Sequence, residues 1–345
     1  MKTINPKGSF TTKIAMVLAA LIFTTSALFS QKWQWVNHYN PSGFYSVNFS
    51  DMNTDAVGNS YAIGNIGEPT VMGTYTLTGI GSYGQFIVKY DSNGTVKWAK
   101  QPLSKGLQYY RIQTDADENS YVIGTFSVSA TIDNFTLTAS GAISSSGNSV
   151  YDLVIVKYDP NGNVVWAKQA GEITSGGNYD ISISNGNSYV TGAFSETAVL
   201  GSYSFSVTAT AYPMATFLSK YDNNGNLLWA NKATTIGSMP RIYPSAIGTD
   251  EAGNSYVTGN FSGTATFDTI TISGIGGYNL FIVKYDPAGN ALWAKQAGDA
   301  NVASSASSYN ISVDATHYNL HITGSFHETI AFDTFTLTTG SNSNY

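Results

Sequence analysis

A lysine that precedes a Tyr-Asp pair recurs along this sequence, and its spacing suggests either ligand binding or a structural role. The four copies are Lys89, Lys157, Lys220 and Lys284. Four ammonium groups in equivalent places could face an anionic ligand. Alternatively, each lysine packs its aliphatic stem along a neighbouring sheet and meets a carboxylate or a carbonyl, as a scaffold feature copied with the repeat. We favour the scaffold, because catalytic centres are seldom copied in every repeat.

An Asp-x-x-Gly turn follows each lysine, and closely spaced oxygen ligands would suit Ca²⁺. The turns begin at Asp91, Asp159, Asp222 and Asp286. An EF-hand loop has Gly at its sixth position and a bidentate Glu at its twelfth. The twelfth residues here are Pro102, Ala170, Ala233 and Ala297. The spacing therefore indicates hairpin-turn chemistry, and only a calcium site of another kind stays open.

Three of the four histidines lie close together near the end of the sequence, which raises the question of zinc. They are His317, His321 and His327, while His38 lies apart. A tetrahedral site needs a fourth ligand, and the chain has no Cys and no consistent carboxylate partner here. We interpret His321 as a substituted repeat position where the other repeats carry Tyr, and we predict no metal site.

The carboxylates show no pattern typical of an enzyme. Hydrolysis would need two positioned carboxylates or a nucleophile with its base, and the glutamates fall mostly in expected turns and loops. They are Glu68, Glu118, Glu172, Glu196, Glu251 and Glu328. The sequence also lacks a Gly-x-Ser-x-Gly elbow, a phosphate loop and a dinucleotide fingerprint. We therefore predict no catalytic residue, no cofactor-binding residue and no cofactor.

These residues belong to an internal repeat, and the spacing of the tryptophans gives its length. Trp35, Trp98, Trp166, Trp229 and Trp293 follow one another at intervals of 63, 68, 63 and 64 residues. A second motif, of the form Gly-Asn-Ser-Tyr-Val-x-Gly, keeps the same phase. Turn residues such as Asp-Pro-Asn-Gly-Asn separate β-branched and aromatic runs, which predicts about four short strands in each unit.

A small antiparallel sheet needs neighbours to cover its faces, and radial stacking of such sheets supplies them. We therefore predict an all-β fold, a β-propeller of about five four-stranded repeats of roughly 65 residues, the last one incomplete. The expected units are residues 31–101, 102–171, 172–233, 234–298 and the partial 299–345. A linear β-solenoid is the alternative, although it would favour shorter coils without tight Asn-Gly hairpins.

The repeat also resembles a known family. The segments that carry the resemblance read GNSYVTGNFSGTATF, FIVKYDPAGN and ALWAKQAG. They are similar to the SBBP-type β-propeller repeat of secreted bacterial proteins, particularly those of the Bacteroidetes. The resemblance covers the chain from about Trp33 onward and implies the propeller fold, but it implies little about molecular function.

The first thirty residues have the pattern of a secretory signal peptide. Lys2, Lys7 and Lys13 precede an apolar run over residues 14–29 that is interrupted by Thr24, Thr25 and Ser26. A membrane anchor is the alternative, but a span needs about twenty apolar residues. We expect cleavage near residue 30, a secreted or cell-surface domain over residues 31–345, and no membrane span in that domain.

Charge and composition narrow the partners. The formal net charge is −6, and an acidic surface repels nucleic acid at long range, so we predict no nucleic-acid partner. Aromatic, Asn-rich and Thr-rich loops suit polar neutral surfaces. The predicted function is a secreted non-catalytic scaffold or binding module for an extracellular protein or glycan. The alternative is a secreted polysaccharide-active enzyme, a glycoside hydrolase or lyase, on a propeller scaffold.

The fifth unit reaches the point where the other units enter their third strand. One interpretation is a chain truncated at Tyr345. The other is a compact ring in which the last blade has three strands. The segment around Trp35 supplies the fourth strand of that blade, and its third strand is missing.

Overall fold

The computed structural model describes residues 34–39, 47–78, 84–104, 106–141, 147–207, 214–274, 277–298, 306–314, 319–327 and 329–339. Contacts divide the chain into two units, Met1–Asn37 and His38–Tyr345. The predicted signal peptide lies outside the described residues. Residues 34–39 form no strand, whereas the compact-ring interpretation would have a strand around Trp35. The described residues contain no helix that is long and apolar enough to cross a membrane.

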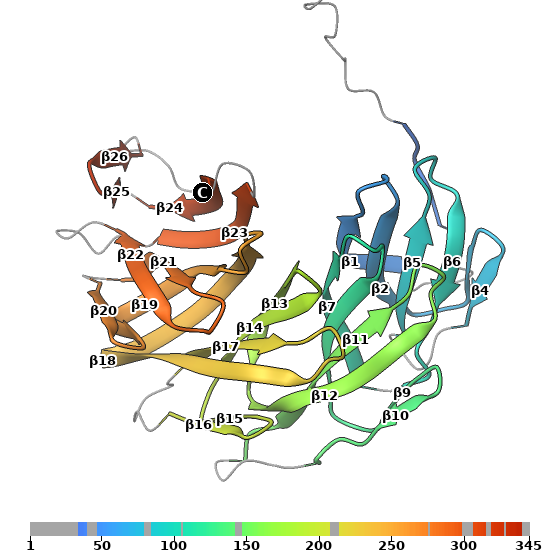
Figure 1. Ribbon diagram of the computed structural model, residues 1–345, viewed down its shortest axis with the longest axis horizontal. Coiled ribbons are helices and arrows are strands. Elements are labelled where there is room, and N and C mark those ends of the chain that lie inside the picture. Colours follow the sequence, from blue (N-terminus) through green and yellow to red (C-terminus); the bar gives the residue numbers. More distant parts are fainter. Residues whose placement is uncertain are drawn as a thin grey trace, which may run out of the picture. The chain divides into compact units, whose positions relative to one another are not determined.

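The second unit is built from antiparallel strands that repeat in order (Figure 1). Repeat 1 forms a sheet in the order β1-β2-β5-β6, with a separate hairpin, β3–β4, inserted between its second and third strands. The strands of repeat 1 are β1 (Val47–Thr54), β2 (Ser60–Ile66), β3 (Thr70–Met72), β4 (Tyr75–Leu77), β5 (Gly84–Tyr90) and β6 (Val96–Lys100).

Repeats 2 and 3 follow the same plan. Repeat 2 contains β7 (Leu107–Thr114), β8 (Ser120–Phe126), β9 (Ala130–Ile132), β10 (Phe135–Leu137), β11 (Val150–Tyr158) and β12 (Val164–Thr174). Repeat 3 contains β13 (Gly177–Ser184), β14 (Asn187–Phe194), β15 (Thr197–Leu200), β16 (Tyr203–Ser206), β17 (Ala215–Tyr221) and the first part of β18 (Leu227–Thr249). The second part of β18 is the first strand of repeat 4.

Repeat 4 continues with three further strands and a hairpin, and the described part of repeat 5 contains two hairpins, β23–β24 and β25–β26. The remaining strands of repeat 4 are β19 (Ser255–Phe267), β20 (Ile270–Ser273), β21 (Asn279–Tyr285) and β22 (Ala291–Ala297). Those of repeat 5 are β23 (Ala306–Asp314), β24 (Asn319–Phe326), β25 (Thr329–Phe332) and β26 (Phe335–Thr338).

In repeats 3 and 4 the inserted hairpin pairs with the last strand of the repeat before it. The end of β12 in repeat 2 pairs with β15 in repeat 3, with Glu172 opposite Val199. In the same way, residues 233–236 of β18 pair with residues 264–267 of β19. This pairing explains why β19 continues without a break to Phe267.

The core lies between consecutive repeats. One cluster joins Tyr61 and Ile87 of repeat 1 to Val154 and Val156 of repeat 2, and all four side chains are fully buried. Most of β8 and β11 is buried on both faces, and apolar residues at successive positions, such as Leu153–Val156, are typical of sheets covered on two sides. Each repeat therefore depends on its neighbours for burial.

The first strands of the repeats carry β-bulges and cross-link through polar side chains. In repeat 3 the bulge places Asp180 so that its Oδ2 accepts the Ile247 N–H of repeat 4 at 2.8 Å. The Arg111 Nε of repeat 2 lies 3.5 Å from the Asp180 Oδ1. The Asp51 Oδ2 of repeat 1 likewise accepts the Ile112 N–H of repeat 2 at 2.9 Å. Burial raises the pKa of Asp180 to about 7, despite the hydrogen bond from Ile247 and the nearby Arg111.

Replacing Asp180 by Asn should change how stability depends on pH. The folded state keeps a proton on Asp180 between about pH 4 and pH 7, a range in which an unfolded Asp has released it. The contribution of this group is therefore fully present below about pH 4 and is lost as the pH rises toward 7. Asp180→Asn retains an acceptor for the Ile247 N–H without titrating. We expect calorimetry to show the Tm of the variant rising against wild type by a few degrees between about pH 4 and pH 8; parallel profiles would contradict this origin.

Candidate functional site

Two sets of turns lie at one end of the strands, because in an antiparallel meander the turn between strands one and two and the turn between strands three and four fall on the same side. We call this end the turn face. Its third-to-fourth turns begin at Asp91, Asp159, Asp222 and Asp286. In each, the aspartate Oδ1 accepts backbone N–H groups two and four residues later, at 2.8–3.0 Å. The predicted hairpin-turn role of these aspartates is thus confirmed.

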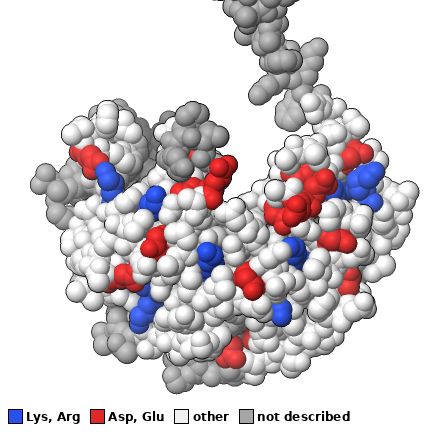
Figure 2. All heavy atoms as spheres, in the orientation of Figure 1, with Lys and Arg blue, Asp and Glu red and all other residues white. Residues whose placement is uncertain are grey.

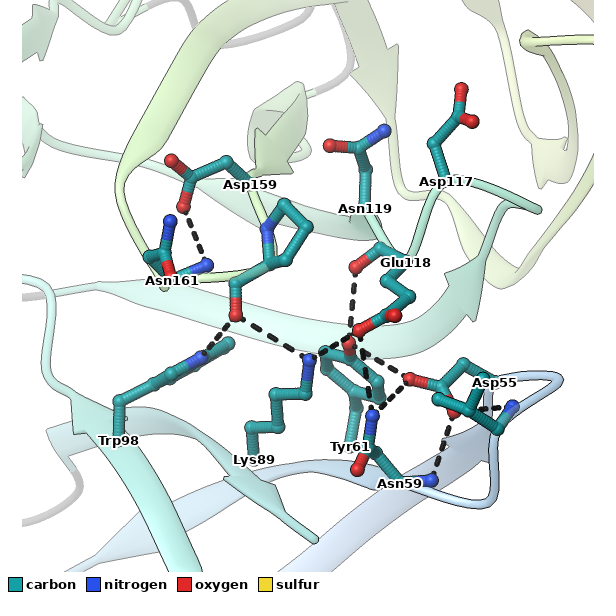
Figure 3. Close-up of polar contacts among 12 residues, drawn as sticks. Asp55, Asn59, Tyr61, Lys89, Trp98, Asp117, Glu118, Asn119, Asp159 and Asn161 are labelled. Atoms are coloured by element: carbon teal, nitrogen blue, oxygen red, sulfur yellow. Dashed lines mark hydrogen bonds and ion pairs between the residues drawn. The ribbon is translucent and has the colours of Figure 1, made fainter.

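The recurring lysine connects one repeat to the turn face of the next. Figure 3 shows Lys89 of repeat 1 pointing toward two acceptors in repeat 2. Its Nζ lies 3.0 Å from the Glu118 Oε2 and 3.4 Å from the Pro160 carbonyl oxygen. The same ammonium group lies 4.8 Å from the centre of the Tyr61 ring, a cation–π distance.

Tryptophan completes the contact. The Trp98 Nε1 donates to the Pro160 carbonyl oxygen at 3.0 Å, and the indole packs edge-on against Tyr61 (Figure 3). Gly162 of the same turn lies against the indole, and a Cβ added there would come within 2.7 Å of the Trp98 ring. Its φ of +81° also favours glycine. We call the Lys, Tyr and Trp of one repeat, together with the turn they hold in the next, the latch.

The latch recurs between repeats 2 and 3 and between repeats 3 and 4. Trp166 donates to the Asn223 carbonyl oxygen at 3.0 Å, and Trp229 donates to that of Pro287 at 3.1 Å. Lys157 and Lys220 each lie 4.9 Å from the ring of the second-strand tyrosine beside them. Burial lowers the pKa of both lysines. The scaffold interpretation of the recurring lysine is confirmed, since these ammonium groups bond to the protein itself.

A cavity of about 540 Å³ opens on the turn face, lined by three successive first-to-second turns. Residues 114–117, 183–186 and 249–251 line it, together with Asn223. The middle turn is a two-residue hairpin in which Asn185 and Gly186 both have positive φ, whereas five residues separate the strands on either side. Because the middle turn is tighter, it reaches less far beyond the strand ends than its neighbours.

Hydrogen bonds fix the cavity walls. The Ser184 Oγ donates to the Asp250 carbonyl oxygen at 2.9 Å, and the Asn185 Nδ2 donates to that of Glu251 at 2.9 Å. The Asp250 Oδ2 accepts from the Asn254 side chain at 2.7 Å. Although burial alone would raise it, the pKa of Asp250 is lowered by its hydrogen bonds from Asn254. Asp250 is thus an ionised part of the wall.

Two carboxylates remain exposed at this cavity, those of Asp117 and Glu251. Neither makes a hydrogen bond or ion pair with the part of the chain that the structure describes. Acidic and basic side chains are scattered over the mostly uncharged face in Figure 2, with one larger acidic group. The cavity therefore offers exposed acceptors beside walls made of Ser, Thr and Asn.

The residues singled out in the sequence fall mainly in the scaffold. Glu118 forms an ion pair with Lys89 of the first latch, while His317 and Glu328 lie outside the described residues. In the described ranges no three His, Cys, Asp or Glu residues gather as a metal site would require. The sequence analysis did not predict the cavity, because its walls come from turns about 65 residues apart. The short turn at Ser184–Asn187, which departs from the five-residue turns of the neighbouring repeats, was the feature of the sequence that could have indicated it.

No known protein-family model matches the chain. An uncharacterized WD repeat-containing protein of Acanthamoeba polyphaga mimivirus is 27% identical over 181 residues. The match covers 43% of this chain but only 13% of that relative. Together with the all-β strand order, this likeness supports a repeat protein of the β-propeller type. The finer assignment to SBBP-type repeats stays a prediction.

The fit of glycine beneath the latch indole can be tested by comparing two glycines with similar backbone. Gly225 has φ +74°, and an added Cβ would lie 3.1 Å from the Trp166 ring and 2.9 Å from Lys168. Gly147 has φ +85° with nothing within 4 Å. Both Ala variants carry the cost of a positive φ, about 1–2 kcal/mol. We expect Gly225→Ala to lose about 1–3 kcal/mol more in urea unfolding, because the latch must shift. Equal losses would argue against close packing there.

Proposed function

We propose that this chain is a non-catalytic binding module of the β-propeller type that recognises an extracellular protein through the turn-face cavity. The observation that supports it most is the cavity itself, whose walls come from three consecutive repeats held by latches. A site assembled on rigid repeats needs little ordering when it binds, which favours affinity.

The cavity chemistry favours a basic side chain of the partner. Asp117 and Glu251 present exposed carboxylates, and Ser184, Thr249 and Asn185 add uncharged polar groups. An arginine guanidinium could donate to two such acceptors at once. A glycan is the second choice. None of the lining residues is aromatic, so the cavity offers no ring against which a sugar could pack.

The polysaccharide-active enzyme considered from the sequence gains no support from the inner carboxylates of this cavity. Its two inner carboxylates, Asp115 and Asp250, are bonded to Asn119 and Asn254 of their own turns. A general acid or nucleophile would have to be free to reach a glycosidic bond.

The finer architecture and location are part of the proposal. Four antiparallel repeats and a partly described fifth are consistent with about five propeller blades, and the SBBP-like motifs with an exported protein. A cleavable signal over residues 1–30 would deliver the domain outside the cell. N-terminal sequencing of the secreted protein would place the cleavage point.

Peptide and glycan arrays would test the ligand. We expect binding to peptides that carry Arg or Lys, weakened about tenfold in the double variant Asp117→Asn, Glu251→Gln and weakened by raising salt. The matched control is Glu68→Gln, Asp333→Asn, which removes the same charge elsewhere and should leave binding unchanged. Binding to neutral glycans alone would reject a protein ligand, and equal effects of the two pairs would reject the cavity.

A further inference from the structure

Two departures from the repeat pattern meet at the turn-face cavity, and both belong to repeat 3. The first is the two-residue hairpin at Asn185 and Gly186, which stands where the neighbouring repeats have a longer turn. The second is Asn223, at the place where repeats 2 and 4 carry Pro160 and Pro287. Asn223 is exposed and lines the cavity. A Cβ added to Gly186 would lie 3.5 Å from the Asn223 Cγ, so the two departures are adjacent.

Asn223 does the main-chain work of the prolines and adds a side chain to it. Its carbonyl oxygen accepts from the Trp166 Nε1 at 3.0 Å, as a proline carbonyl does in the other two latches. The contact with the lysine differs. Lys220 donates to the Pro287 carbonyl oxygen at 3.1 Å, whereas Lys157 donates to the side-chain Oδ1 of Asn223. The side chain of Asn223 therefore belongs to both the second latch and the cavity wall.

The latch determines which way the Asn223 amide faces. A lysine ammonium group can only donate, so the oxygen of the amide must face Lys157. The Tyr121 hydroxyl donates to the same Oδ1 at 3.1 Å. The amide nitrogen has two hydrogens to donate, and none of the described residues accepts from it. This nitrogen is therefore the polar side-chain atom of Asn223 that is left for a ligand.

Other polar side chains of the cavity wall use their donors within the protein. The Ser184 hydroxyl and the Asn185 amide donate to main-chain carbonyl oxygens of repeat 4. The Thr249 hydroxyl donates to a main-chain carbonyl oxygen of repeat 3 at 3.4 Å. The exposed carboxylates of Asp117 and Glu251 are acceptors when ionised. The cavity thus combines acceptors for a cation with one side-chain donor that a cation cannot satisfy.

We propose that Asn223 selects a protein segment in which a main-chain carbonyl lies beside a basic side chain, the Asn223 Nδ2 donating to the carbonyl oxygen while the cation meets Asp117 and Glu251. A cation alone leaves this donor unmatched, because two donors do not bond to each other. A carboxylate or phosphate acceptor would be repelled by the acids that line the cavity, which are Asp115, Asp117, Asp250 and Glu251. A neutral peptide carbonyl avoids both penalties. The inference rests on the proposed function, since it requires a basic residue of a partner in this cavity.

Two small probes separate the cation from the carbonyl. N-acetyl-arginine N-methylamide carries a guanidinium group and two amide carbonyls, whereas butylguanidine carries the same cation without a carbonyl. Each is titrated into the full chain at millimolar concentration, and its dissociation constant is measured by ligand-observed NMR. We expect the arginine derivative to bind the wild type about three- to tenfold more tightly, as for one neutral hydrogen bond. The readout is the ratio of the two dissociation constants, because a general change in charge affects both probes alike.

Two variants remove the donor and keep the latch. Asn223→Asp retains an acceptor for Lys157. Asn223→Pro restores the residue found at Pro160 and Pro287, whose carbonyl oxygens hold the lysine of the preceding repeat. Both variants should keep a Tm close to that of the wild type and lose the preference for the arginine derivative. Asn224→Asp is the matched control, because it makes the same change one residue away, at an exposed position outside the cavity lining. It should keep the wild-type ratio.

The outcomes separate this inference from the proposed function. Equal binding of the two probes to the wild type, or an unchanged ratio in both Asn223 variants, would overturn selection by Asn223 and leave the cavity as a site for basic groups alone. Failure of both probes to bind, or unchanged binding in the double variant Asp117→Asn, Glu251→Gln, would reject the proposed function and this inference with it. Weakening of both probes by the same factor in that double variant, with the ratio preserved, would support the separate roles of the carboxylates and the amide.

Discussion

A buried lysine ammonium that finds its acceptors in the next repeat is the constraint on which this architecture depends. Lys89, Lys157 and Lys220 are only 5%, 6% and 9% exposed. Removing such a charge from water is costly unless it is paired. The Pro160 and Pro287 carbonyls and the Asn223 side chain provide those partners from the following repeat. A repeat in isolation would leave this cation unpaired, so burial and charge pairing both require the neighbour.

The latch in turn fixes the chemistry of the turn it holds. The carbonyl must sit at the second residue of the turn, and the turn must pass beneath an indole without a side chain. In the turn that begins at Asp286, hydrogen bonds from the side chain and the backbone of Asn290 lower the pKa of Asp286, and both of its carboxylate oxygens accept from Asn290. The turn aspartates, which resembled calcium ligands in the sequence, therefore accept hydrogen bonds within their own turns. The carboxylate of Asp117, by contrast, is left exposed.

Much of the fold was predictable, because repetition made weak local signals add up. Tryptophan spacing set the phase, and Asn-Gly turns marked the hairpins around residues 159–163 and 222–226. The pairing of β12 with β15 was not predictable, since a short Thr-rich or Ser-rich segment does not specify which strand it joins. Asp180 was missed for a similar reason: its partners, Arg111 and Ile247, lie almost seventy residues away on either side. Such contacts depend on how sheets stack, and local sequence carries no record of that.

The same physics explains how a repeat scaffold could carry a specific site. Latch residues are copied because each must fit its neighbour, whereas the contacts of the first-to-second turns differ from repeat to repeat: Glu118 pairs with Lys89 through its side chain, while Gly253 accepts from the Tyr189 hydroxyl through its carbonyl oxygen. Their side chains are therefore free to vary. At Ser184–Asn187 the five-residue Asp turn is replaced by a two-residue hairpin, while Tyr189 and Lys220 below it keep their stacked arrangement. A hollow can thus arise between repeats 2 and 4 without disturbing the latches, and Asn223 of the second latch forms part of its wall.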